Sequence, residues 1–112
     1  MTPFDRARAV LTDHDLPTRL IPDNVVASSW NPHTGTLTAT LASPVHTTFD
    51  SIPVRYAKRV RAVVRPGHIP ELHGVEARIA FWVKVTAIRG EPESLVFSVG
   101  RINKRLPLAA FR

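Results

Sequence analysis

Four arginines are the residues in this chain best suited to binding a ligand. All four stand at odd-numbered positions in a segment where apolar and polar residues alternate: Arg55, Arg59, Arg61 and Arg65. Successive side chains of an extended segment point to opposite faces, so the four guanidinium groups are expected on one face. A planar guanidinium binds carboxylate or phosphate through two parallel hydrogen bonds. The spacing predicts a basic stripe for an acidic ligand. The alternative is a solvated face whose charges pair with neighbouring acids such as Glu76, Glu91 or Glu93.

Metal and thiol chemistry have little support. The chain has no cysteine, which excludes a disulfide framework, a thiolate nucleophile and a Cys-ligated metal. No histidine has another at i+2 or i+4, and we interpret all five as surface or turn residues: His14, His33, His46, His68 and His73. His68 and His73 flank one predicted loop and form the one pair worth following. No cofactor or metal is expected.

An esterase-like hydrolase is an alternative to a binding function. No Gly-x-Ser-x-Gly motif, Gly-rich phosphate loop or dinucleotide fingerprint is present. A triad built on Ser28 or Ser29, with a histidine and Asp23 or Asp50, stays open on sequence alone. The preferred interpretation is non-enzymatic.

The charge balance favours an anionic partner. Fifteen Lys and Arg against nine Asp and Glu give a net charge of +6 and a pI near 11.1. Twelve of the fifteen are Arg, and the chain also has ten Pro, a mixture that GC-rich coding DNA would also produce. Only 7% of residues are aromatic, too few to interleave with the basic residues as single-stranded nucleic acid requires. Nucleic acid is therefore not expected.

The length and composition indicate one globular domain over residues 1–112. Hydrophobic residues make up 44% of the chain, and no repeat or low-complexity tract interrupts it. Charged residues at Asp5, Arg6 and Arg8 exclude an apolar signal-peptide core near Met1. No stretch is apolar enough for a spanning helix. We expect a cytoplasmic protein.

The first element is predicted to be a short helix over residues 3–14. Thr2 is a good N-cap, Pro3 suits the first helical position, and Asp5 complements the positive helix end. Apolar residues then recur at helical spacing, which gives the helix one face to dock.

After the helix the period changes to two, which predicts strands. Turn residues separate them, and the expected ranges are about 25–30, 36–41, 45–49, 54–64, 75–88 and 94–99. Residues 75–88 alternate throughout, and we expect one long, strongly bent strand there. Glu71–Gly74 is predicted to be a loop, 100–105 a polar connection, and 106–111 an apolar edge strand or docked segment. The pattern predicts a mainly β fold: a small antiparallel barrel or sandwich of six to seven strands with one N-terminal helix.

Several motifs resemble the plant family called domain of unknown function 538. They are Leu16-Pro17, Leu20-Ile21-Pro22-Asp23-Asn24-Val25, Val54-Arg55-Tyr56, the run Gly67–Val75, Trp82-Val83, Val99-Gly100 and Leu106-Pro107. The resemblance covers essentially the whole chain. It implies a small β-barrel-like domain with a short helix, and a link to stress responses and development. Lipid-binding and esterase roles are both proposed for the family, and no catalytic residue is agreed that could be carried over. Arg19 stands where many members have glycine.

The sequence therefore predicts a non-enzymatic binding module. The expected partner is an anionic lipid or an amphipathic small molecule, held by an apolar groove or interior shared with the helix. Arg55, Arg59, Arg61 and Arg65 are expected to bind its acidic headgroup. An esterase-like hydrolase and a protein-interaction domain without a small ligand are the alternatives.

Overall fold

The computed structural model describes residues 1–111, which form one helix, two 3₁₀ turns and eight strands. The helical elements are α1 (Pro3–Asp13), η1 (Thr18–Leu20) and η2 (Leu108–Phe111). The strands are β1 (Val25–Asn31), β2 (Thr36–Leu41), β3 (Val45–Phe49), β4 (Ile52–Arg65), β5 (His68–Arg78), β6 (Trp82–Glu91), β7 (Ser94–Val99) and β8 (Ile102–Pro107).

Helix α1 begins where its capping residues predict. The Asp5 amide donates to Thr2 Oγ1 at 3.0 Å, and the Thr2 amide donates back to Asp5 Oδ2 at 3.2 Å, which completes a capping box. The hydrogen bond from the Thr2 amide lowers the pKa of the Asp5 carboxyl. The apolar face of α1 buries Ala7, Val10 and Leu11 against the sheet.

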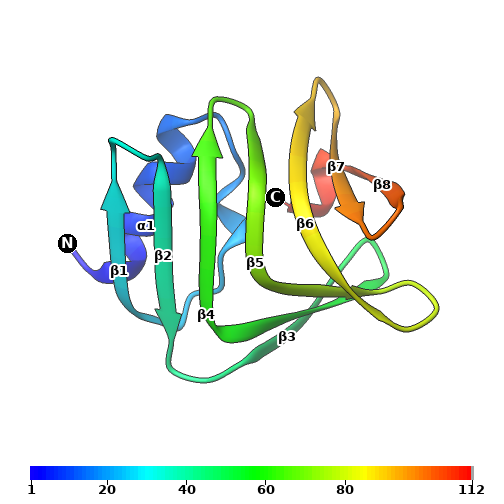
Figure 1. The fold of residues 1–112 in the computed structure, drawn as a ribbon, viewed down its shortest axis with the longest axis horizontal. Coiled ribbons are helices and arrows are strands. Elements are labelled where there is room, and N and C mark those ends of the chain that lie inside the picture. The colour runs from blue at the N-terminus through cyan, green and yellow to red at the C-terminus, as the bar shows by residue number, and fades with distance from the viewer. Residues whose placement is uncertain (112) are drawn as a thin grey trace.

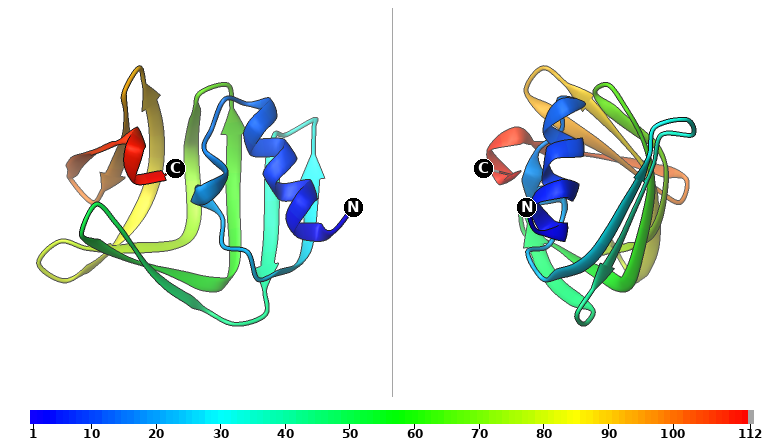
Figure 2. Two further views of the ribbon diagram at one scale, coloured as in Figure 1. Left: turned by 180° about the vertical axis from the view of Figure 1, so that it is seen from behind. Right: turned by 90° about the vertical axis from the view of Figure 1, so that its left-hand side faces the viewer.

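The strands form one antiparallel sheet in the order β1-β2-β4-β5-β6-β7-β8, and β3 pairs with β4 outside this path (Figure 1). The mainly β antiparallel class with one N-terminal helix is confirmed. The sheet has eight strands and is not closed into a barrel within the described residues, since no ladder joins β1 to β8. It curls around α1, which lies on its concave side (Figure 2).

A sharp bend in β4 and β5 divides the sheet into two parts. The first half of β4 pairs with β3, and the second half pairs with β2. Between these halves the β4–β5 register jumps, so that residues 57–60 of β4 lie opposite Gly74 alone. Gly74 has φ of +96°, and a Cβ there would lie 2.4 Å from the Arg59 carbonyl oxygen. The bend therefore requires a residue without a side chain.

The alternation over 75–88 predicts one strand, and the structure instead has β5 and β6 joined by a tight turn at 79–81. In this hairpin Arg78 pairs with Trp82 and Ala77 with Val83. Because the connecting loop has three residues, paired positions have the same parity, and the apolar residues stay on one face through the reversal. The loop residues Ile79, Ala80 and Phe81 also lack ordinary turn chemistry.

Two segments expected as loops are strands. Residues 71–74 lie within β5, where Glu71, Leu72 and His73 pair with β4. Most of the connection expected over 100–105 belongs to β8, an edge strand whose residues are exposed except for Leu106. Edge strands tolerate such polar sequences because one side faces solvent. Beyond them, η2 docks Phe111 between Phe49 and Phe97, with ring centroids 4.7 and 5.8 Å apart.

Buried side chains fill the centre of the core between the sheet and the helix. Tyr56 is buried there, its hydroxyl donates to the Leu20 carbonyl at 2.8 Å, and burial raises the pKa of this phenol. An apolar hollow of about 50 Å³ remains beside it, smaller than the roughly 300 Å³ of a small-molecule site. The interior is therefore a packed core.

We predict that Gly74→Ala lowers the free energy of unfolding more than Gly67→Ala. Both glycines have positive φ, but nothing lies within 4 Å of a Cβ at Gly67. The left-handed conformation costs about 1–2 kcal/mol at either position, and only the Gly74 variant also meets backbone. Urea unfolding measures both changes. Equal losses would show that the contact with Arg59 is relieved without strain.

Candidate functional site

A groove opens where β5 and β6 separate. These strands pair near their hairpin, through Glu76 and Lys84, and again at Ile69 and Ile88. Between those pairs six positions of β5 face three positions of β6, and the ladder is interrupted. The resulting groove has a volume of about 820 Å³. This volume lies within the range of small-molecule sites.

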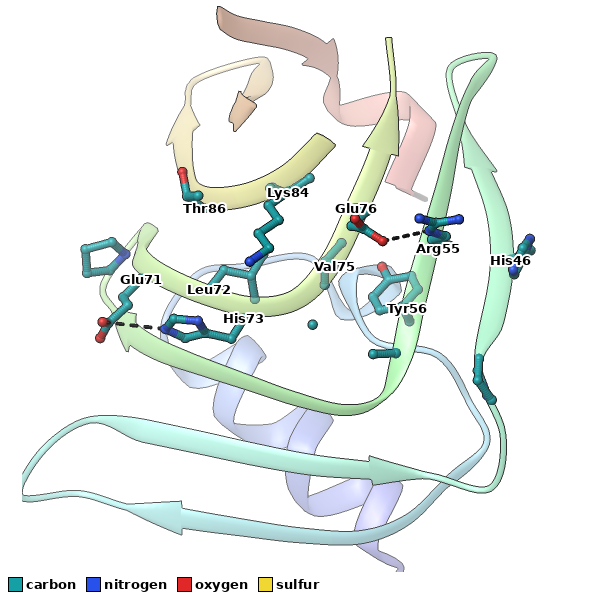
Figure 3. A pocket seen from close by; sticks show the side chains of 15 residues that line it. His46, Arg55, Tyr56, Glu71, Leu72, His73, Val75, Glu76, Lys84 and Thr86 are labelled. Atoms are coloured by element: carbon teal, nitrogen blue, oxygen red, sulfur yellow. Dashed lines mark hydrogen bonds and ion pairs between the residues drawn. The ribbon is translucent and has the colours of Figure 1, made fainter. Parts of the chain in front are cut away.

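The groove has an apolar floor and a charged rim (Figure 3). Tyr56, Leu72, Val75 and Val85 contribute apolar surface. The rim carries charged or titratable side chains on β3, β4, β5 and β6: His46, Arg55, Glu71, His73, Glu76 and Lys84. This combination suits a ligand with an apolar part and a polar end.

Two of the charged rim groups neutralise each other. Arg55 Nε donates to Glu76 Oε1 at 2.7 Å, and the Arg55 guanidinium lies 4.3 Å from the centroid of the Trp82 ring. His46 packs edge-on against the same ring, with centroids 6.2 Å apart. Arg55 is thus held by an acid and an indole, and it is the one member of the arginine stripe for which the paired alternative applies.

The second acid of the rim is also engaged. Glu71 Oε1 lies 3.6 Å from His73 Nε2. The Lys84 side chain forms no ion pair or hydrogen bond with any residue in the described part of the chain. Figure 3 shows its side chain extending from β6 across the groove toward Leu72 and His73. Lys84 is therefore the cation of this rim that is available to a ligand.

The remaining arginines of the stripe lie outside the groove. The segment is extended, as predicted, and all three are exposed: Arg59 lies in the bend, and Arg61 and Arg65 lie beyond it from Arg55. Arg61 stands opposite His73 across the ladder. Arg65 donates to the Thr34 carbonyl at 3.3 Å, whereas Arg59 and Arg61 have no ion-pair partner among residues 1–111. Parity along β4 does not bring the four guanidinium groups to one ligand.

A second hollow lies on the helix side of Tyr56 and His46. It has a volume of about 450 Å³ and is lined in part by Phe4 and Arg8 of α1 and by Val45 of β3. This hollow corresponds most closely to the groove shared with the helix that the sequence predicts. Its lining is less apolar than that of the β5–β6 groove.

The residues considered for catalysis and metal binding are not brought together. Ser28 Oγ donates to the Pro3 carbonyl at 2.8 Å, and no hydrogen bond joins a serine hydroxyl to a histidine ring within residues 1–111. Those residues also contain no cluster of three or more His, Asp or Glu with metal-binding proximity. None of the helices described is long and apolar enough to cross a bilayer.

Sequence reasoning missed the groove because it depends on a register interruption. Lys84 is recognisable on the outer face of its strand, but parity does not show that β5 turns away from it. The one available signal was Gly74, a glycine within a run that otherwise pairs well.

Comparison with known proteins gives a family and one distant relative. A family model described as "Protein of unknown function, DUF538" matches residues 7–112. An uncharacterized protein of Arabidopsis thaliana is 24% identical over 97 residues, which is 86% of this chain. The chain spans 57% of that relative's length.

We predict that Arg55→Gln destabilises the fold and that Arg59→Gln does not. Loss of the partly exposed ion pair and the indole contact should lower the free energy of unfolding by about 1 kcal/mol. Arg59 is on the same strand without a partner, so its replacement should change stability by less than about 0.5 kcal/mol. Urea unfolding compares them. Equal stabilities would contradict the pairing described for Arg55.

Proposed function

The chain belongs to the DUF538 family, whose function is unknown, and we propose that it is a non-enzymatic binding module for an anionic amphipathic ligand. The ligand lies in the β5–β6 groove, with its apolar part on the floor and its acidic group at Lys84. The observation that carries this proposal is an open, largely apolar groove of about 820 Å³ whose rim carries Lys84, a cation that forms no ion pair with a described residue.

The apolar floor supports a hydrocarbon rather than a sugar or a nucleotide. The groove wall is more apolar than polar, and Leu72, Val75 and Val85 contribute to it. Contact with an apolar chain removes more of this surface from water, which stabilises a complex by about 25 cal/mol for each Å² buried. The packed interior supports binding in the groove rather than in the core.

The rim supports a negative headgroup. Glu76 already accepts from Arg55, and Glu71 lies beside His73, so both carboxylates have a positive or titratable neighbour. Lys84 has none. An ammonium group at the edge of an apolar groove favours a carboxylate or phosphate because the surrounding protein weakens screening by water.

The outer arginines support attraction of the ligand rather than contact with it. Arg59 and Arg61 are exposed on the adjoining face of β4, without acidic partners in the described residues. Their field acts over a Debye length of about 10 Å at moderate salt, which raises the local concentration of an anion. Arg65 extends the same face.

We predict that decanoate binds the groove and that Lys84→Gln weakens this binding. Titration followed by ¹H–¹⁵N NMR should shift the amides of Leu72, Val75 and Val85. Loss of one partly exposed charge pair should reduce the affinity about fivefold, equivalent to roughly 1 kcal/mol. Decyl maltoside, which has the same chain and no charge, should bind Lys84→Gln and the unchanged protein equally.

Lys58→Gln is the matched control, since Lys58 is exposed on β4 and does not line the groove. Its affinity for decanoate should stay within twofold of the unchanged protein. Absence of amide shifts in the groove would contradict the proposal, as would equal losses in the two lysine variants. Sustained hydrolysis of p-nitrophenyl decanoate that is lost in Ser28→Ala or Ser29→Ala would favour the esterase alternative.

A further inference from the structure

The tip of the β5–β6 hairpin is an exposed apolar projection. Figures 1 and 2 show it extending beyond the rest of the sheet, at the end of the molecule away from the N-terminus. Phe81 is 71% exposed and Ile79 is 39% exposed, although both have large apolar side chains. An exposed phenylalanine at a hairpin tip contributes nothing evident to folding, which points to an interaction.

Neighbouring turns add to this apolar end. Ile102, at the start of β8, is 52% exposed. The β7–β8 turn lies against β6, since a Cβ at Gly100 would be 3.3 Å from Val83. Of the five large apolar side chains that are exposed among residues 1–111, three therefore lie in the β5–β6 turn or at the start of β8, whereas Met1 and Val26 belong to the N-terminus and β1.

Cations surround the apolar tip. Arg78 precedes it directly, and Lys104 lines the same shallow hollow as Arg78 and Ile79. Arg101 is exposed in the β7–β8 turn. None of the three forms an ion pair with a described residue. The adjoining β3–β4 turn carries one carboxylate, Asp50, so the local charge is positive.

We propose that this end of the molecule docks on an anionic membrane surface. Phe81 and Ile79 enter the region between headgroups and acyl chains, and Arg78, Arg101 and Lys104 contact the headgroups. The combination favours a membrane over a protein partner because large exposed apolar side chains beside cations complement an apolar layer beneath a negative surface. This docking does not require a ligand in the β5–β6 groove.

The test is sedimentation of the whole chain with vesicles of phosphatidylcholine alone or with 30% phosphatidylglycerol, in 0.1 M NaCl. The unchanged protein should sediment with the anionic vesicles and not with the neutral ones. Phe81→Ser should weaken this binding at least tenfold, because the inserted aromatic surface is lost. The double variant Arg78→Gln/Lys104→Gln should weaken it severalfold, and 0.5 M NaCl should do the same through screening.

Val26→Ser is the matched control, because Val26 is also exposed and lies at the other end of the sheet. It should bind vesicles like the unchanged protein. Circular dichroism melts should show all variants folded, since the replaced side chains are exposed.

A second measurement reports the orientation. In a Trp30→Phe background, brominated lipid should quench Trp82, the residue that follows the tip. Vesicle binding without quenching would overturn the proposal, as would equal binding by Phe81→Ser and Val26→Ser or no binding to the anionic vesicles. A lipid-free dimer that Phe81→Ser dissociates would assign the tip to self-association and would also overturn it.

Discussion

The fold depends on the close approach of Gly74 to the backbone of Arg59. Four residues of β4 pass opposite this single residue, and both strands turn sharply there. The first half of β4 can then pair with β3 while the second half pairs with β2. Because β5 bends with β4, it leaves β6 between their two paired regions. One steric requirement thus produces both the curl around α1 and the groove.

The bend also explains why the four arginines of β4 do not gather at one site although their spacing in the sequence predicts it. Arg55 shares its parity with Arg59, Arg61 and Arg65, but the bend separates it from them. On its side of the bend it meets Glu76 and Trp82, and on the other side the arginines face solvent. Alternation within a strand therefore predicts which face a side chain occupies. It does not predict which neighbours that face will have.

Much of the fold follows from local sequence signals. The Thr2–Asp5 capping box, the alternation in β2 and the turn at Pro66-Gly67 are decided by nearby residues, and the structure has elements at those places. The β5–β6 turn could not be found in this way, because a three-residue reversal preserves parity and Ile79-Ala80-Phe81 has no turn residue. The groove was equally hidden, since it arises from a register interruption between strands. The strand β8 was not predicted because its sequence is polar. Its pairing with β7, and not an apolar face of its own, holds it in the sheet.

The open sheet leaves β1 and β8 as free edges, and such edges can recruit strands from other molecules. On β8 the exposed residue Lys104 places a positive charge at the border, and Pro107 lacks an amide donor. On β1 the register slips between Val25 and Ala27, which distorts the row of hydrogen-bonding groups. Each of these two edges thus has a feature that disfavours the addition of a strand from another molecule. The sheet can therefore stay open, without closing into a barrel, and still resist aggregation.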